Sequence, residues 1–367
     1  MVVAPPVAPR LGLQCEAIAT DTTTIRSLDW DRSRFDIEFG LRNGTTYNAF
    51  LVRGERTALI DTSHAKFRDT WIPLLKQQID PTTIDVLIVS HTEPDHSGLI
   101  GDLIDLNPEI EIVGSKVALQ FLQDQVHRPF QSRAVKSGEE LDLGTNPDSG
   151  VQHRFEFLSA PNLHWPDTIF SFDHGTGILY TCDAFGLHYC SDDVFDQDPG
   201  AIAPDFRFYY DCLMGPNARS VLQALKRMDS LPEIKTIAVG HGPLLHHHLS
   251  HWVGDYRDWS SQRSKGESYA AVCYLSQYGF SDRISQAIAH GVGKAVAQVQ
   301  LVDLRATDPQ ELTALIGDAK AVVVPTWPAE PDADLQTSIG TLLAALHPKQ
   351  LVCLLYTSDA ADDEERG

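Results

Sequence analysis

The first two thirds of the chain alternate short apolar runs with longer amphipathic stretches. Runs rich in β-branched or aromatic residues predict strands, and six lie between Asn43 and Gly242: TALIDT, IDVLIVS, EIEIVGS, RFEFLSA, GILYTCD and KTIAVGH. Between them, KFRDTWIPLLKQQI and KVALQFLQDQV place apolar residues three and four positions apart, which is typical of helices with one buried face. This mixture predicts sheets covered by helices, an α/β fold.

A second pattern follows towards the C-terminus. The segment from His251 to Glu267, HWVGDYRDWSSQRSKGE, is polar. It shows neither the apolar periodicity of a strand nor that of a helix, so we interpret it as a linker. The runs YAAVCYL, QVQLVDL and KAVVVPT then alternate with helical stretches, an order that predicts the start of an open parallel sheet. The predicted domains are residues 1–265 and 266–352.

The last residues do not continue this pattern. TSDAADDEERG carries five acidic residues against Arg366, and no further strand or helix is predicted after it. A doubly wound domain needs more chain than this. We therefore predict that residues 353–367 are a non-native or disordered tail, with a plain acidic C-terminus as the alternative.

Charge and composition narrow the possible partners. The 367 residues include 50 acidic residues against 29 Lys plus Arg, a formal net charge of −21, and the basic residues form no patch. Nucleic acid and anionic membrane surfaces are therefore not expected as partners. No run approaches the about 18 apolar residues of a membrane helix. Because the six cysteines include no C-x-x-C pair, we expect a cytoplasmic protein with free thiols.

The motif SHTEPDHSG concentrates metal-binding side chains directly after an apolar run. It places His91, Glu93, Asp95 and His96 within six residues. Imidazole and carboxylate groups together suit first-row transition metals. Residues two apart in a loop after a strand can converge on one ion while their neighbours face another. The loop therefore predicts a site for two adjacent metals.

Three further candidates follow later β-rich runs: His164 in NLHWPDT, Asp183 in CDAFG and His241 in GHGP. One such residue alone is more often an ordinary loop or capping group, but their recurrence after successive strands favours a shared centre. His188 is a candidate for orienting a ligand or lining the pocket. Cys182 is expected to face the core, opposite Asp183, by strand alternation.

The segments HTEPDHSG, NLHWPDT, CDAFG and GHGP, in this order and spacing, resemble the metallo-β-lactamase-type domain of the flavodiiron proteins. The resemblance includes GTTYNAFLVRGERTALIDT and DYRDWS, so it extends over most of the chain. It implies a metallo-β-lactamase-like αββα sandwich followed by a partial flavodoxin-like doubly wound parallel sheet. It also implies the ligands of two irons: His91, Glu93 and His164 for one, Asp95, His96 and His241 for the other, and Asp183 as a bridge.

Glu93 distinguishes two interpretations of this site. Zinc hydrolases of the same fold typically carry His-x-His-x-Asp-His, with a histidine where this chain has Glu93. A carboxylate adds negative charge and suits a metal that cycles between Fe(II) and Fe(III), whereas zinc has no redox chemistry. The sequence favours an iron redox centre over a zinc hydrolase.

The second domain is expected to bind FMN. In flavodoxins the loop after the first strand holds the FMN phosphate. Here two aromatic residues replace hydroxyl residues of the family pattern, so a purely structural turn is an equal alternative for this loop: Ser276, Gln277, Tyr278, Gly279, Phe280 and Ser281. Pro325, Thr326 and Trp327 are expected beside the flavin ring, with a surface aromatic or a partner contact as the alternative for Trp327.

The resemblance implies an oxidoreductase that reduces O2 to water at a di-iron centre with electrons from FMN. The alternatives are nitric oxide reduction at the same centre, a zinc-dependent hydrolase, and a non-catalytic partner subunit of a hetero-oligomer. Related proteins carry a flavin reductase module that draws on a nicotinamide or ferredoxin donor, and we expect that module to be absent here. Since the two cofactors belong to different domains, a head-to-tail homo- or hetero-dimer is expected.

Overall fold

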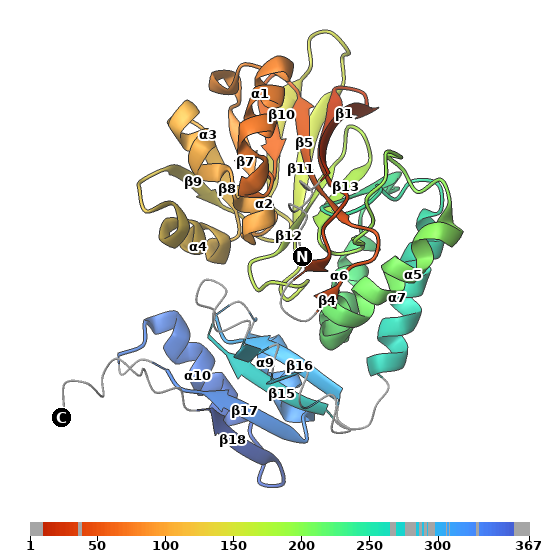
Figure 1. Ribbon diagram of the computed structural model, residues 1–367. Helices are drawn as coiled ribbons and strands as arrows, with labels where there is room; N and C mark the ends of the chain where they lie inside the picture. Colours follow the sequence, from red (N-terminus) through yellow and green to blue (C-terminus); the bar gives the residue numbers. More distant parts are fainter. Residues whose placement is uncertain are drawn as a thin grey trace, which may run out of the picture. The chain divides into compact units, whose positions relative to one another are not determined.

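The protein is described by a computed structural model that covers residues 10–35, 39–264, 269–275, 284–285, 288–289, 292, 298–305, 307, 309–327 and 330–355. The chain divides into two compact units (Figure 1). One consists of Met1–Gly215 with Ser220–Ser261, and the other of Pro216–Arg219 with Gln262–Gly367.

A seven-stranded sheet forms one half of the first unit. Its order is β1-β2-β5-β6-β7-β8-β9. The antiparallel part consists of β1 (Leu11–Ala19), β2 (Thr22–Asp29), β5 (Thr45–Arg53) and β6 (Thr57–Ile60). The parallel part continues from β6 through β7 (Val86–Ile88), β8 (Glu111–Gly114) and β9 (Gln131–Ala134). Helices α1 (Arg68–Gln78), α2 (Pro94–Ser97), α3 (Ile100–Leu106) and α4 (Lys116–Val126) lie between these strands in sequence.

A five-stranded sheet forms the other half. It consists, in order, of β10 (Glu140–Thr145), β11 (Gln152–Ser159), β12 (Ile169–Asp173), β13 (Ile178–Cys182) and β14 (Thr236–Val239). Only β13 and β14 pair in parallel. The accompanying helices are α5 (Pro199–Tyr209), α6 (Ala218–Met228) and α7 (Leu249–Ser264). A short pair, β3 (Arg34–Phe35) and β4 (Phe39–Gly40), lies outside both sheets.

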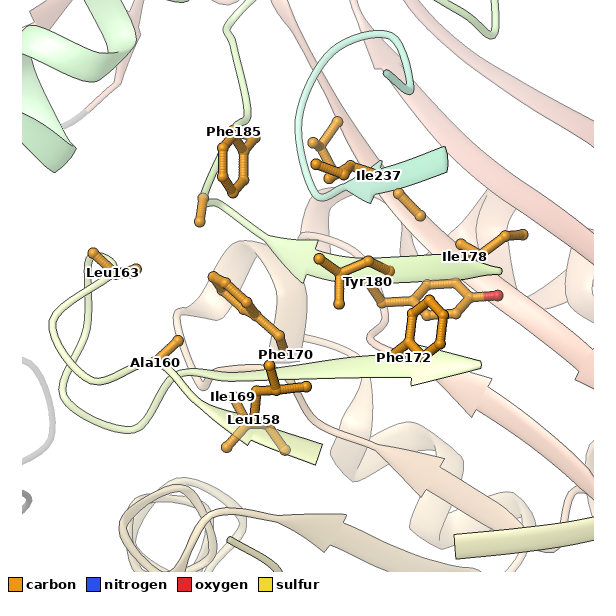
Figure 2. Close-up of a cluster of buried hydrophobic side chains, with 14 of the residues drawn as sticks. Leu158, Ala160, Leu163, Ile169, Phe170, Phe172, Ile178, Tyr180, Phe185 and Ile237 are labelled. Carbon is orange, nitrogen blue, oxygen red and sulfur yellow. The ribbon is translucent and has the colours of Figure 1, made fainter. Parts of the chain in front are cut away.

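The buried residues show how these layers pack. Successive residues of β5 enter two different clusters, because side chains alternate along a strand. Phe50 and Val52 pack with the second sheet and with residues of α5, α6 and α7, whereas Tyr47 and Ala49 pack with α1, α3 and α4. Helices therefore cover the outer face of each sheet, and the predicted αββα sandwich is confirmed. Figure 2 shows part of the first cluster, with Phe170, Phe172 and Tyr180 on β12 and β13.

The segment from His251 to Glu267 was interpreted as a linker, and this prediction was wrong for the residues up to Ser264. They belong to helix α7, whose buried residues are Trp252, Tyr256 and Ser260. These positions are four apart and so lie on one face of the helix. The buried face of this helix is therefore narrow. Polar residues lie between the buried positions, so the sequence shows no clear helical periodicity.

The second unit contains a four-stranded parallel sheet in the order β16-β15-β17-β18. Its elements are β15 (Tyr269–Tyr274), β16 (Gln298–Asp303), α9 (Pro309–Asp318), β17 (Ala321–Pro325), α10 (Ala333–Ala345) and β18 (Leu351–Leu355). Because β16 and β17 lie on opposite sides of β15, the sheet is doubly wound, as expected for a partial flavodoxin-like fold.

The tail predicted to begin at residue 353 starts inside a strand. β18 runs to Leu355 and pairs with β17 along its whole length. Residues 356–367 lie outside the described residues, so the origin of that segment stays a prediction.

The state of the cysteines and the character of the helices both bear on predictions from the sequence. None of the six cysteines forms a disulfide, as expected. Among the helices of the described part, none combines the length and the apolar character that crossing a membrane requires.

Candidate metal centre

The loop after β7 and the single turn of α2 supply four of the candidate ligands. His91 and Glu93 lie in the loop, and Asp95 and His96 lie in α2. Pro94 occupies the first position of this helix, where its fixed φ angle favours helix initiation. The short segment from His91 to His96 therefore carries four potential metal donors, and all four side chains are buried.

The other three candidates come from connections of the second sheet. His164 lies between β11 and β12, Asp183 directly follows β13, and His241 follows β14. β13 and β14 are parallel neighbours, with Cys182 opposite Val239. The carboxyl ends of parallel neighbours meet at one edge of a sheet, which brings Asp183 and His241 together.

One oxygen of the Asp183 carboxylate faces the first group of donors. Its Oδ2 lies 3.1 Å from His91 Nε2 and 2.9 Å from His164 Nε2. The same His164 nitrogen lies 2.9 Å from Glu93 Oε2. The donor atoms of His91, Glu93, His164 and Asp183 all lie within 4.8 Å of one another, a spacing suited to one metal ion.

The other oxygen of Asp183 faces the second group. Its Oδ1 lies 3.0 Å from His96 Nε2 and 3.4 Å from His241 Nε2, while Asp95 Oδ2 lies 3.3 Å from His241 Nε2. Asp183 therefore stands between two sets of three donors, and its two oxygens point to different sets. The flavodiiron resemblance implies the same grouping, and the assignment of these donors to two irons stays a prediction.

The glycines on either side of His241 permit this packing. A Cβ atom at Gly240 would lie 2.7 Å from Cε1 of His96. Gly242 has a φ angle of +82°, and a Cβ atom there would lie 2.6 Å from the carbonyl oxygen of Leu187. Only glycine combines that φ angle with so close an approach. His241 is further fixed by a 2.7 Å hydrogen bond from its Nδ1 to the carbonyl oxygen of Thr46.

The electrostatics of the cluster favour a bound cation. Burial opposes ionisation of Asp183, but the charges of His96, His91 and His241 hold its pKa well below the usual value. Burial likewise lowers the pKa of His96, yet the charges of Asp95 and Asp183 outweigh this and raise that pKa to about 10. Buried carboxylates need protonated or metallic partners. The mixed imidazole and carboxylate donors fit iron.

Cys182 departs from its prediction. It is buried, as expected, but its sulfur lies within 4.8 Å of the donor atoms of His91, His96 and Asp183 instead of on the opposite face. Strand alternation fails here because the β13–β14 register shifts between Tyr180 and Cys182, and Cys182 adopts a left-handed φ of 51°.

His188 lies beside the second donor set. Its ring centroid is 4.8 Å from that of His241, and its Nδ1 is 2.9 Å from the hydroxyl of Thr45. Burial, and then the proximity of His241, lower the pKa of His188 well below its usual value. The imidazole is therefore neutral.

Tyr209 is a site residue that the sequence analysis missed. Its ring lies 4.9 Å from His188 and 6.2 Å from His241. Burial first, and then the charges of neighbours that include Asp183 and Glu93, raise the pKa of its hydroxyl well above the usual value. That hydroxyl has no hydrogen-bond partner among the described residues. No sequence signal identified Tyr209, because its spacing from buried residues of α5 is that of an ordinary apolar helix face.

The predicted flavin contacts lie partly outside the described residues, which exclude 276–281. Pro325 ends β17, and Thr326 and Trp327 follow it at the surface. Ligands of open parallel sheets bind at the carboxyl ends of strands where the winding reverses. That reversal lies between β15 and β17, so Thr326 and Trp327 lie at the expected edge.

The fold and the site together define a class of protein. An αββα sandwich gathers seven buried histidine, aspartate and glutamate side chains at its strand ends. It is joined in the same chain to a doubly wound parallel sheet. This is a metallo-β-lactamase-like domain with a candidate two-metal centre, followed by a flavodoxin-like domain.

Comparisons with known proteins specify the family. A family model described as ODP family beta lactamase matches residues 45–242. Diflavin flavoprotein A 1 of Synechocystis sp. (strain ATCC 27184 / PCC 6803 / Kazusa) is 57% identical over 359 residues, which cover 98% of this chain and 61% of that protein. Putative diflavin flavoprotein A 3 of Nostoc sp. (strain PCC 7120 / SAG 25.82 / UTEX 2576) is 57% identical over 97% of this chain and 61% of its own length.

A solved structure agrees with these relatives. The metal-soaked Flv1 flavodiiron core from Synechocystis sp. PCC6803 is 31% identical, with a TM-score of 0.80 over 97% of this chain and 89% of that chain. The chain therefore belongs to the flavodiiron proteins, which carry a di-iron centre and FMN, and it contains the core of such a protein. It spans about 61% of the length of the curated relatives named above.

Proposed function

We propose that the chain is the core of a flavodiiron oxygen reductase that reduces O2 to water. In this proposal His91, Glu93 and His164 hold one iron, Asp95, His96 and His241 hold the other, and Asp183 bridges them. The observation that carries it is the position of the Asp183 carboxylate, with one oxygen 2.9 Å from His164 and the other 3.0 Å from His96.

The charge of the donors supports iron over zinc. Three of the seven are carboxylates, and Glu93 stands where zinc hydrolases of this fold carry histidine. Anionic oxygen donors stabilise the higher oxidation state of a redox metal. When bound, the irons supply Fe(II)/Fe(III) chemistry and FMN supplies electrons.

Two further side chains have roles in this proposal. Tyr209 carries an unpartnered hydroxyl on a ring that lies beside His188 and His241, and we assign it to donate a hydrogen bond to an oxygen atom of the substrate. Neutral His188, held by Thr45, packs against His241 and fixes its ring orientation.

The remaining parts of the proposal concern the flavin and the assembly. Residues 276–281 and 325–327 are proposed to bind FMN, supported by the position of Thr326 and Trp327 at the reversal of the sheet. A head-to-tail homo- or hetero-dimer is proposed because the two cofactors belong to different domains. The electron donor is a nicotinamide cofactor or ferredoxin acting through a flavin reductase module. A cytoplasmic location is proposed because the six cysteines are present as thiols and not as disulfides.

The first test is the metal content of protein purified without oxygen. We expect about two irons per chain, in agreement with a two-metal mechanism, and oxygen consumption when reduced FMN is supplied. Nitric oxide is tested in parallel as the alternative substrate, and faster consumption of nitric oxide would reassign the reaction. About two zincs and no iron after reconstitution with Fe(II) would instead favour a hydrolase or a non-catalytic subunit.

A further inference from the structure

Arg26 is a fully buried cation in the first sheet, outside the metal centre. It lies on β2, directly opposite Gln14 of β1 and Asn48 of β5, and its side chain is completely inaccessible to solvent. Burial lowers the pKa of Arg26 only to about 10, so the guanidinium remains charged at neutral pH. A buried charge requires a compensating partner.

The hydrogen bonds of Arg26 occupy only one part of the guanidinium. Nη1 donates to Gln14 Oε1 at 2.6 Å and to the carbonyl oxygen of Asp193 at 3.0 Å. Nε and Nη2 have no hydrogen-bond partner among the described residues. These two nitrogens lie along one edge of the planar group and offer parallel N–H donors, the arrangement that binds two oxygens of one oxyanion.

The surroundings of Arg26 do not supply its counter-charge. Asp192 and Asp193 are close enough to act on it electrostatically, but both are exposed to solvent, which screens their charge. The thiol of Cys190 is also nearby, but burial raises its pKa to about 12. Cys190 is therefore neutral, and within the described part of the chain no carboxylate forms an ion pair with Arg26.

Asn48, opposite Arg26 on the neighbouring strand, adds an unpartnered acceptor. Its Nδ2 donates to the carbonyl oxygens of Val239 and Gly242, each at 2.9 Å, which fixes the orientation of the amide. Its Oδ1 is buried without a hydrogen-bond partner among the described residues. Because Asn48 and Arg26 are directly opposite on antiparallel strands, their side chains lie on the same face of the sheet with Cβ atoms about 5 Å apart.

We propose that Arg26 and Asn48 form a binding site for a small planar oxyanion of the bicarbonate class. Two oxygens accept from Nε and Nη2 of Arg26, and the hydroxyl of the anion donates to Oδ1 of Asn48. We assign entry to the side of Asp193, whose side chain is exposed and whose carbonyl oxygen accepts from Nη1 of Arg26. Since Asn48 also holds the backbone on both sides of His241, occupancy of the site stiffens the segment that carries this residue.

The test is calorimetric titration of the whole protein with sodium bicarbonate at constant ionic strength and pH. We expect saturable binding of about one anion per chain. Formate and nitrate retain the two contacts with Arg26 but lack the hydroxyl, so each binds about tenfold more weakly, the usual effect of losing one hydrogen bond. Chloride cannot bridge both donors of the edge and shows no saturable binding.

Two variants make the result specific to Arg26. Arg26→Lys keeps the positive charge and all seven metal donors but removes the two-donor edge, so bicarbonate binding is expected to be lost. Arg53→Lys is the control, because Arg53 is a partly buried arginine that, like Arg26, donates to neutral oxygens. Bicarbonate binding by this variant is expected to be unchanged.

Three results would overturn the proposal. If wild-type protein shows no saturable binding, water satisfies Arg26, and this outcome does not depend on whether the variants fold. If chloride binds as tightly as bicarbonate, the planar geometry is wrong. If folded Arg26→Lys protein binds bicarbonate like wild type, the anion binds elsewhere, for instance at the metal centre.

Discussion

The Nε2 atoms of His96 and His241 lie 3.1 Å apart in the buried metal centre. Nδ1 of His241 is hydrogen-bonded to the carbonyl oxygen of Thr46, so its Nε2 is the ring nitrogen that faces the other donors. His96 Nε2 also lies 3.0 Å from Asp183 Oδ1. A proton or a metal ion must therefore occupy the space between these acceptors, and the two compete for it.

The first prediction follows from this competition. Metal uptake has to displace the protons that the histidines hold, since the pKa of His96 is raised to about 10 in the cluster without metal. We expect Fe(II) affinity to fall by about tenfold or more for each unit of decreasing pH. Titrations with a competing chelator between about pH 6 and 8 will measure it, and release of protons on binding is the direct control. A pH-independent affinity would contradict the prediction.

Replacing the bridging carboxylate is expected to empty both sites. Asp183→Asn removes the negative charge that both donor sets share, so iron content should fall from about two per chain to less than one. Asp173→Asn is the matched control, because Asp173 is an equally buried aspartate that contacts His153 outside the cluster. If Asp183→Asn retained both irons in a folded protein, the bridging assignment would be wrong.

Glu93→His is expected to change metal preference. It converts the motif to the His-x-His-x-Asp-His pattern and removes one anionic donor, which lowers the preference for Fe(III). Reconstitution with equal Fe(II) and Zn(II), followed by elemental analysis, should show more zinc per chain than in wild type. An unchanged ratio would mean that Glu93 does not determine the metal.

Tyr209→Phe tests the unpartnered hydroxyl. We expect iron content to be retained and oxygen turnover to fall by roughly tenfold, because one hydrogen bond to the substrate is lost. Tyr210→Phe removes the neighbouring hydroxyl, which is bonded to Ser260, and should leave turnover unchanged. Equal rates in the two variants would exclude the proposed role of Tyr209.

His153 is expected to make stability depend on pH. Burial lowers the pKa of His153, but its hydrogen bonds and charge interactions with Asp173 and Asp21 outweigh this and raise it above the usual value. Its stabilising contribution is therefore complete below the unfolded pKa of about 6.5 and is lost as pH rises through the folded pKa. Urea unfolding of wild type and His153→Gln should differ most at low pH and converge at high pH. A difference that grows with pH would contradict this sign.

Patterns in the chain predicted sheets covered by helices, and they indicated candidate metal donors after successive strands. The donors follow strands whose apolar runs are distinct, and the carboxyl ends of those strands converge. β2 was missed because its buried positions include Thr24, Arg26 and Ser27, so the strand has no apolar alternation. Two of these residues are hydrogen-bonded to distant parts of the chain: the Thr24 hydroxyl donates to the carbonyl oxygen of Ala49 at 3.3 Å, and the hydroxyls of Ser27 and Ser63 lie 2.7 Å apart. Residues distant in sequence provide such contacts, and local patterns do not show them.

Other residues were mispredicted because the local rule failed. Alternation placed Cys182 on the wrong face, because a register shift and a left-handed residue interrupt it at the end of β13. The polar segment that follows His251 formed a helix with a narrow buried face. Tyr209 belongs to an apolar helix stripe, and only the three-dimensional neighbourhood distinguishes it from a core tyrosine.

The donors of the metal centre belong to both halves of the sandwich. His91, Glu93, Asp95 and His96 follow a strand of the seven-stranded sheet, whereas His164, Asp183 and His241 follow strands of the five-stranded sheet. Each donor set contains members from both sheets, so each bound ion acts as a cross-link between them. Metal binding energy then becomes folding energy. Under the proposed ligand assignment, the two halves of the domain can separate only when both ions are released, so the ions that the proposed redox chemistry requires would also stabilise the fold.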